Sequence, residues 1–211
     1  MALIEDLQAR HAFHRVLDVG MGFQTLLLEK LLPGSRIDCL GVEQDNRFRP
    51  SRDFTFYAAD LNDAAIEVPP GPIAARFDLI VFMEVLEHLY TPPDLILGYL
   101  ASLLTDGGVI IVTTPNAVWL KNRLKMLRGK NPFETLRPNR KDMGHIREYT
   151  KAKLEKTFSA TELHQLSFER RGLHHFNNLK DNGYSFMADR IHSSLSRTLV
   201  AVYQKAGRAT E

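Results

Sequence analysis

The stretch RVLDVGMGFQT, residues 15–25, decides the fold of this chain. Its segment 16–19 is a mostly apolar run of the kind found in strands that are buried on both faces. The spacing of Gly20 and Gly22 predicts a turn at which a ligand can approach the backbone closely. The apolar pattern that follows predicts a helix over 25–32. The sequence therefore predicts a strand, a glycine turn and a helix in direct succession.

Two interpretations of the glycine turn are open. It can be a tight connection between a strand and a helix, with no further role. It can also be a nucleotide pocket, because the first turn of a helix has unpaired N–H groups and a partial positive charge. The next apolar run, 37–42, ends in Glu43, 21 positions after Gly22. An acidic residue at this position holds a ribose diol in dinucleotide-type folds, which favours the nucleotide pocket.

Two kinds of nucleotide chemistry share this layout, one with nicotinamide or flavin cofactors and one with S-adenosylmethionine. The nicotinamide fingerprint is G-x-G-x-x-G, in which the third glycine allows close packing of helix against strand. Thr25 occupies that third position here. The sequence thus disfavours a nucleotide-dependent oxidoreductase, which stays open as an alternative.

Length and composition set the broad class of the protein. A chain of 211 residues can bury a sizeable core and is predicted to form one domain. No apolar stretch approaches the roughly 20 residues of a membrane span, and the segment MALIEDLQARHAFHR lacks the pattern of a signal peptide. Cys39 is the only cysteine, which excludes an internal disulfide and a thiolate cluster. We expect a cytoplasmic protein in which Cys39 is a small core residue.

The net charge of +2 hides an uneven distribution. Residues 121–141 contain eight basic side chains and one acidic side chain, Glu134, for a local charge of +7. The other 19 basic and 24 acidic residues give −5 for the remainder. One segment is therefore basic while the rest of the chain is mildly acidic.

The remaining pattern alternates apolar runs with helical periodicity. Such alternation predicts a parallel sheet with right-handed crossovers and helices on both faces. A short helical stretch is expected over 84–89, and a turn over 106–108. The other expected elements are helices at 3–13 and 94–104, strands at 54–58, 77–82 and 109–114, and two terminal strands at 163–170 and 197–203 with a helix-like piece at 184–195 between them.

The order of these motifs resembles the class I S-adenosylmethionine-dependent methyltransferases, within them the small-molecule enzymes of ubiquinone-biosynthesis type. The matching segments are VLDVGMG at 16–22, FDLIVFMEVLEHL at 77–89, TDGGVIIVTTPN at 105–116 and GHIREYTKAKL at 144–154, together with Glu43 and Asp60. The segment after the fifth strand resembles bacterial methyltransferases of cell-surface polysaccharide pathways. The resemblance implies an α/β, Rossmann-like, doubly wound sheet of seven strands, mostly parallel with the last strand antiparallel. We expect a single domain over 1–211 with a basic insertion at about 117–143.

The resemblance also assigns S-adenosylmethionine as cofactor and implies the residues that bind it. Asp18 would orient the amino end of the methionine moiety, Glu43 would accept both ribose hydroxyls, and Asp60 would face the adenine amino group. Asp18 could instead cap a turn, and Asp60 could instead be the N-cap of a following helix. Gln24 occupies a position where the family often has a third glycine, so it would crowd the carboxylate end of the cofactor. The complete predicted cofactor set is Asp18, Gly20, Gly22, Gln24, Glu43, Gln44, Asp60, Leu61, Met83 and Glu84.

His88 and His145 are the candidate catalytic residues. Glu84 and His88 are four residues apart, so a helix would place them on one face as a hydrogen-bonded pair beside the cofactor. A metal site would need a third ligand that the sequence does not place, so we expect none. His145, in the segment 144–149, can remove a proton from a hydroxyl during methyl transfer, because an imidazole titrates near neutrality. A purely structural role for His145 is the competing interpretation.

Three interpretations compete for the basic segment. It can be a solvated surface helix, a site for an anionic acceptor such as a phosphorylated or lipid-linked sugar, or a peripheral membrane contact through 117–130. Interleaved aromatic residues and nucleic-acid-binding motifs are missing from it, so we expect no nucleic acid partner. Taken together, the sequence predicts a methyltransferase that methylates an oxygen, before nitrogen or carbon, of a small-molecule or lipid-linked sugar acceptor. The non-enzymatic alternative is a methyltransferase-like domain that binds the cofactor without catalysis.

Overall fold

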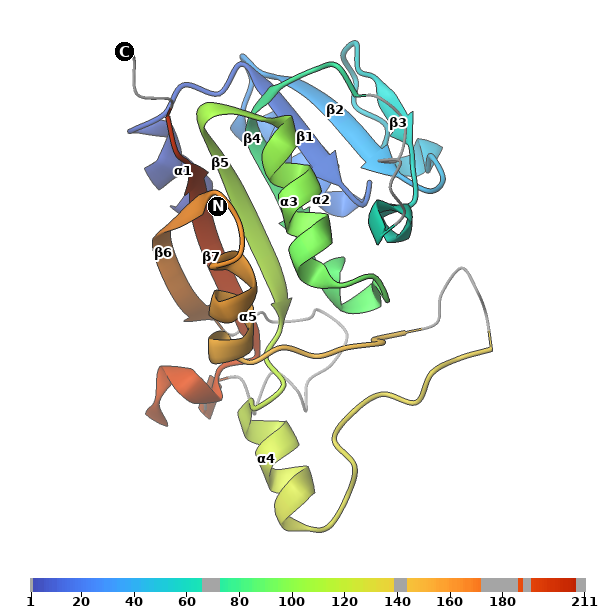
Figure 1. Ribbon diagram of the computed structural model, residues 1–211, viewed down its shortest axis with the longest axis vertical. Coiled ribbons are helices and arrows are strands. Elements are labelled where there is room, and N and C mark those ends of the chain that lie inside the picture. The colour runs from blue at the N-terminus through green and yellow to red at the C-terminus, as the bar shows by residue number, and fades with distance from the viewer. Residues whose placement is uncertain (1, 66–72, 139–143, 172–185, 188–190, 208–211) are drawn as a thin grey trace.

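A computed structural model describes residues 2–65, 73–138, 144–171, 186–187 and 191–207 of the chain. A seven-stranded sheet in the order β3-β2-β1-β4-β5-β7-β6 forms its centre (Figure 1). Strand β7 is antiparallel to both of its neighbours, and the pairs among β1 to β5 are all parallel. The predicted Rossmann-like sheet with an antiparallel last strand is confirmed. The strands are β1 (Arg15–Val19), β2 (Arg36–Gly41), β3 (Phe56–Ala58), β4 (Phe77–Met83), β5 (Leu104–Pro115), β6 (Leu163–Arg171) and β7 (Thr198–Lys205).

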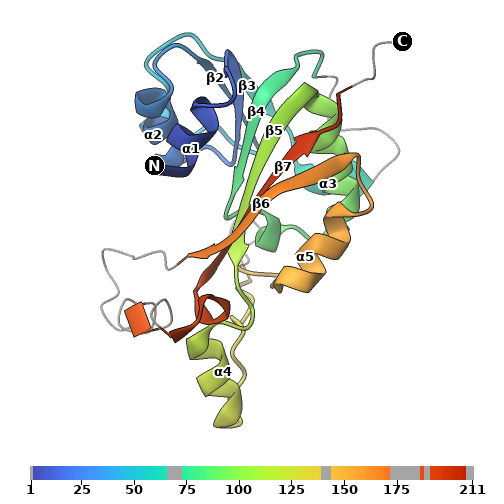
Figure 2. The same cartoon turned by 90° about the vertical axis from the view of Figure 1, so that its left-hand side faces the viewer.

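Helices cover both faces of the sheet, as Figure 2 shows. Helices α1 (Ala2–Gln8) and α2 (Phe23–Leu31) lie on one face, and α3 (Pro93–Leu103) and α5 (Lys151–Phe158) lie on the other. Alternate residues of the central strands supply the two cores. In β4, for example, Leu79 belongs to the core under α1 and α2, while Ile80 belongs to the core under α3 and α5. This is the two-sided burial that the apolar runs predict.

Helix α4 (Leu120–Leu127) differs from the others because it projects away from the sheet (Figures 1 and 2). It lies inside the predicted basic insertion, of which residues 139–143 fall outside the described part of the chain. Within α4 only Asn122 is buried. No helix in the described part of the chain is long and apolar enough to cross a membrane.

Several predicted boundaries shift. Helix α1 stops at Gln8 instead of residue 13, and β2 stops two residues before Glu43. The turn predicted at 106–108 is an irregularity within β5, where the register with β4 shifts between Phe77 and Leu79. The helix-like piece at 184–195 lies partly outside the described residues and ends in the 3-10 turn η4 (Ser193–Leu195).

Asp38 fixes the register at the start of the sheet. Its buried carboxylate pairs with Arg15 of β1 at 2.7 Å and with Arg36 of β2 at 2.9 Å. The same carboxylate accepts the backbone N–H of Thr55, just before β3, at 2.8 Å. One buried anion thus connects three strands near their amino ends, and their carboxyl ends are therefore aligned at the opposite end of the sheet. The predicted cofactor residues lie at this carboxyl end.

Candidate active site

The glycine turn between β1 and α2 has the close approach that its sequence predicts. Gly20 has φ +86, a conformation that a residue with a side chain rarely adopts. A Cβ atom on Gly20 would lie only 2.6 Å from Cγ2 of Val85, which follows β4. Gly22 is the N-cap of α2, so the free N–H groups of the helix begin here. The turn therefore requires glycine, and any side chain at Gly20 would close the space beside Val85.

Asp18 is completely buried at the carboxyl end of β1. Its Oδ2 accepts a hydrogen bond of 2.5 Å from the Thr25 hydroxyl, which in turn accepts the N–H of Gly22 at 3.0 Å. Its Oδ1 has no hydrogen-bond partner among the described residues. Burial raises the pKa of Asp18 to about 7, against the opposing effect of the Thr25 hydrogen bond. The site thus holds a carboxylate oxygen that lacks a donor, and a ligand ammonium group would supply one.

Gln24 lies over the same turn. Its side-chain amide donates a hydrogen bond to the carbonyl oxygen of Gly20, and a Cβ on Gly22 would lie 2.7 Å from its Oε1. This position agrees with the crowding expected from the missing third glycine. A ligand that binds the Gly20 carbonyl therefore shares this oxygen with Gln24 or displaces the Gln24 side chain.

The other predicted cofactor residues lie at the same end of the sheet, after β2, β3 and β4. Glu43 and Gln44 are exposed beyond the end of β2. Asp60 follows β3, and its carboxylate accepts the N–H of Asn62 at 2.9 Å, which is the capping contact of the competing interpretation. Leu61 is buried at the start of the 3-10 turn η2 (Leu61–Ala65). Met83 is half-buried and ends β4.

The predicted pairing of Glu84 with His88 on one helix face is wrong. Glu84 has φ +52, and only the 3-10 turn η3 (Leu86–His88) forms in place of a helix over 84–89. The left-handed residue breaks the helical path at its first position. Glu84 instead accepts a hydrogen bond of 2.7 Å from the Thr113 hydroxyl of β5. Glu84 is exposed as a whole residue, but desolvation of its carboxyl raises the pKa, with the Thr113 bond opposing.

Glu87, which the sequence interpretation did not single out, joins His88 and His145 in one cluster. One potential ligand atom from each of these three side chains lies within 4.8 Å of the other two. The imidazole rings of His88 and His145 meet edge to face, with centroids 5.0 Å apart. The Glu87 side chain is 1% exposed, whereas those of His88 and His145 are 40% and 30% exposed. The cluster is therefore one buried carboxylate beside two partly exposed imidazoles.

Electrostatics favour neutral groups in this cluster. Burial, and then the nearby Glu84 carboxylate, raise the pKa of Glu87 to about 8. Burial, and then the charge of His88, lower the pKa of His145. A neutral His145 offers a lone pair at neutral pH, which a general base requires. The signal that could have identified Glu87 is its place inside the apolar run VLEHL. Burial of an acidic side chain there costs free energy unless the carboxylate has a partner or binds a ligand.

The comparisons with known proteins identify the family. A family model described as a methyltransferase domain matches residues 2–174. The chain belongs to this methyltransferase family. Membership confirms the predicted class I S-adenosylmethionine-dependent methyltransferase and its cofactor, and it identifies an enzyme of methyl transfer in place of an oxidoreductase. A search of curated protein sequences gives no match.

Solved structures share this fold at low sequence identity. N-methyltransferase NodS from Bradyrhizobium japonicum WM9, in complex with S-adenosyl-L-homocysteine, has a TM-score of 0.57 and 15% identity over 97% of this chain and 84% of its own. An S-adenosylmethionine-dependent methyltransferase from Clostridium acetobutylicum ATCC 824 has a TM-score of 0.62 and 15% identity over 98% and 89%. The StiE O-MT has a TM-score of 0.54 and 12% identity over 99% and 75%.

The carboxyl end of the methyltransferase's sheet fits S-adenosylmethionine in its local chemistry. The unpaired Oδ1 of Asp18 suits the ammonium group of the methionine moiety, and the bare backbone at Gly20 leaves room for a ligand. Asp18 and Gly20 are both members of the predicted set of cofactor-binding residues. The assignment of the individual residues remains a prediction that binding measurements can test.

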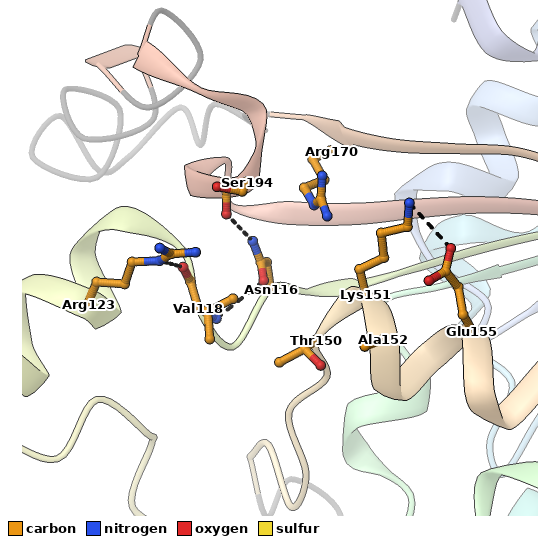
Figure 3. Close-up of a pocket in the computed structure, with 9 residues that line it drawn as sticks. All are labelled: Asn116, Val118, Arg123, Thr150, Lys151, Ala152, Glu155, Arg170 and Ser194. Carbon is orange, nitrogen blue, oxygen red and sulfur yellow. Dashed lines mark hydrogen bonds and ion pairs between the residues drawn. The ribbon is translucent and has the colours of Figure 1, made fainter.

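A pocket of about 280 Å³ lies at the carboxyl end of β5, beside the start of α5 (Figure 3). Asn116 lies in its middle, between Arg123 of the methyltransferase's α4 and Lys151 of α5. Arg170 of β6 lines it as well, and Lys151 pairs with Glu155 at 3.3 Å. The pocket thus brings three cationic side chains and one carboxylate together. The full lining is Asn116, Val118, Arg123, Thr150, Lys151, Ala152, Glu155, Arg170 and Ser194.

Proposed function

We propose that the methyltransferase methylates an oxygen atom of an anionic acceptor, a small-molecule or lipid-linked sugar. The observation that carries the proposal is the pocket lined by Arg123, Lys151 and Arg170. Three cations against the single carboxylate of Glu155 favour a negatively charged occupant. The resemblance of the segment after the fifth strand to polysaccharide-pathway enzymes supports the sugar class.

The pocket and the Glu87–His88–His145 cluster share the carboxyl end of β5. The Thr114 hydroxyl donates to Glu87 at 3.1 Å, and two residues later Asn116 lines the pocket. A backbone bridge joins Asn116 to Tyr149, four residues after His145. An acceptor anchored by its anionic group in the pocket would therefore have the cluster nearby for its reacting hydroxyl.

The protein's part in the reaction is mostly positioning. S-adenosylmethionine supplies an electrophilic methyl group when it is bound. Asp18 and the glycine turn would hold its methionine end, and Glu43 would hold its ribose. His145 would take the proton that the acceptor hydroxyl loses as the methyl group arrives, since its lowered pKa keeps it neutral at pH 7. A hydroxyl is a weak nucleophile until its proton is removed, whereas an uncharged amine can attack without a base, so the presence of a general base favours oxygen as the acceptor atom.

Helix α4 supports the lipid-linked form of the acceptor. Leu127, at its end, is 82% exposed, and Met126 and Phe133 are exposed beside it. Lys121, Arg123 and Lys125 add positive charge along the same helix. A projecting helix with apolar and basic side chains is suited to the surface of an anionic membrane, where lipid-linked acceptors reside.

Methyl transfer assays on a panel of acceptors test the proposal. Phosphorylated, nucleotide-linked and polyprenyl-phosphate-linked sugars should accept methyl groups as ethers, while their uncharged counterparts should not. Arg123→Glu and Arg170→Glu should each raise the KM of the anionic acceptor at least tenfold and leave the affinity for S-adenosylhomocysteine unchanged. The matched control is Lys156→Glu, an exposed position on α5 outside the pocket lining. Equal KM values in all four proteins, or equal turnover of neutral sugars, would contradict the proposal.

A further inference from the structure

The Glu87 carboxylate has one oxygen in use and one without a partner. Its Oε2 accepts the Thr114 hydroxyl at 3.1 Å. Its Oε1 is buried and has no hydrogen-bond partner within the described residues. An unpaired carboxylate oxygen at such depth is costly unless a cation or a donor reaches it. A cation that reached Oε1 would therefore be stabilised there.

The ring of His88 is oriented so that its lone pair faces this oxygen. Its Nδ1 lies 3.0 Å from the carbonyl oxygen of Gly144, and a carbonyl only accepts, so the proton of the neutral ring is on Nδ1. The lone pair is then on Nε2, which lies 3.9 Å from Oε1 of Glu87. A cation placed between Nε2 of His88 and Oε1 of Glu87 would be attracted by both of these electron-pair donors. A backbone carbonyl behind a histidine is also the usual second partner of a metal-binding imidazole.

Backbone hydrogen bonds hold the segment that carries His145 against Glu87. The N–H groups of Ile146 and Arg147 donate to the carbonyl oxygen of Glu87 at 2.8 and 3.2 Å. Gly144, with φ +84, turns the chain immediately before His145. The histidine is therefore docked on the 3-10 turn η3 by backbone bonds that do not depend on its own side chain.

We propose that a divalent transition-metal ion binds between Oε1 of Glu87, Nε2 of His88 and a ring nitrogen of His145. Two imidazoles and one carboxylate are a ligand set used for Zn²⁺, Fe²⁺ and Mn²⁺, and they leave coordination positions open. Metal–ligand bonds of about 2.0–2.2 Å need the three atoms somewhat closer than their present 4.8 Å limit. The two partly exposed imidazoles can make that adjustment by turning. The site corrects the expectation that no third ligand is available.

A role of the ion in methyl transfer rests on the proposed function: the acceptor hydroxyl would take one of the coordination positions that three protein ligands leave open. A hydroxyl oxygen bound to the ion would lose its proton to solvent more readily, because the ion lowers the pKa of the hydroxyl. A lone pair that binds metal cannot also take a proton, so His145 would then act as ligand and not as base. Binding of the ion itself requires neither cofactor nor acceptor.

Metal binding to the tag-free, chelator-treated full chain tests the proposal directly. Calorimetry with ZnCl₂ and visible absorption with CoCl₂ should each show one ion per chain. His145→Ala and Glu87→Gln should each weaken Zn²⁺ binding at least tenfold. His164→Ala is the matched control, because His164 is exposed on β6 and should leave binding unchanged. Loss of binding in a His174→Ala/His175→Ala variant, with His145→Ala unaffected, would overturn the proposal, as would no stoichiometric binding by the wild type.

A second measurement separates misfolding and the proposed function from the metal site. The thermal shift caused by S-adenosylhomocysteine should persist in His145→Ala and Glu87→Gln, which shows that both variants fold. Zn²⁺ binding that survives while no anionic sugar is methylated would reject the proposed function and keep the site. Methylation that is unaffected by chelation, in a protein that binds no Zn²⁺, would reject the site and keep the function.

Discussion

At the scale of single residues, Asp18 gives the methyltransferase a pH-dependent stability. The pKa of Asp18 is about 7 in the folded chain and 3.8 in an unfolded one. Between these values the folded state keeps a proton that the unfolded state loses. The free energy of unfolding should therefore fall as the pH rises from about 4 to about 7, by at most about 1.4 kcal/mol per pH unit. Asp18→Asn cannot titrate, so its profile should be flatter in this window, which urea unfolding at several pH values measures. Parallel profiles for the two proteins would rule out this assignment.

Gly20 permits a second residue-scale prediction. Alanine at this position has to adopt φ +86, which costs roughly 1–2 kcal/mol, and its Cβ meets Cγ2 of Val85. Gly20→Ala should therefore destabilise the protein more in the wild-type background than in a Val85→Ala background. The coupling free energy from this double-mutant cycle should lie at about 0.5–3 kcal/mol, measured by denaturant unfolding. Strict additivity would mean that the turn moves away from Val85 at no cost.

The sequence indicates residues whose role is fixed by local spacing, but not those whose role depends on contacts between distant segments. Gly20 was predicted because a strand, a turn and a helix within 11 residues define its surroundings, and the role of Asp18 was implied by the resemblance of the same motif to the family. Glu87 was missed because its partners, Thr114 and His145, come from segments 27 and 58 positions further along. Glu84 was misplaced because a single left-handed residue, with φ +52, leaves no mark in helical periodicity.

At the scale of elements, α5 is too short to be stable alone and depends on the sheet. The ring of Phe158 stacks on Tyr203 of β7, with centroids 3.6 Å apart, and is completely buried. Phe158→Ala should lower the free energy of unfolding by about 3–5 kcal/mol. Lys156→Ala, exposed on the same helix, should change it by less than about 0.5 kcal/mol. Urea unfolding of both variants tests this prediction. Equal urea midpoints for Phe158→Ala and Lys156→Ala would show that α5 does not depend on the contact between Phe158 and Tyr203.

The elements themselves were largely predictable because each central strand carries its own apolar run. The strands with two buried faces, β1, β4 and β5, were all placed from sequence. Their ends were less accurate where glycine allows a strand to continue. Gly108 lies so close to β4 that a Cβ would be 3.0 Å from the carbonyl oxygen of Phe77, so the predicted turn is absorbed into β5.

At the scale of the whole molecule, cofactor binding should stabilise the fold, because the cofactor binds the folded chain and not the unfolded one. S-adenosylhomocysteine at one hundred times its Kd should add about 2.7 kcal/mol to the free energy of unfolding. Glu43→Ala should weaken binding, because Glu43 is predicted to make two charge-assisted hydrogen bonds to the ribose, each worth roughly 1.5–3 kcal/mol. Titration calorimetry and thermal unfolding should both show the loss, whereas Glu5→Ala, exposed on α1, should bind normally. Unchanged affinity of Glu43→Ala for S-adenosylhomocysteine would show that Glu43 does not contact the cofactor.

The position of β7 between β5 and β6 has a consequence for the growing chain. Strand β6 is synthesised first, but it has no place in the sheet until β7 arrives and pairs with it from Leu163 to Arg171. Until then the edge of β5 from Val109 to Pro115 stays unpaired, and apolar strand edges of this kind recruit strands from other molecules. The nascent methyltransferase should therefore need protection by chaperones until β7 has been made, because β7 closes the sheet and follows the other described strands in the chain.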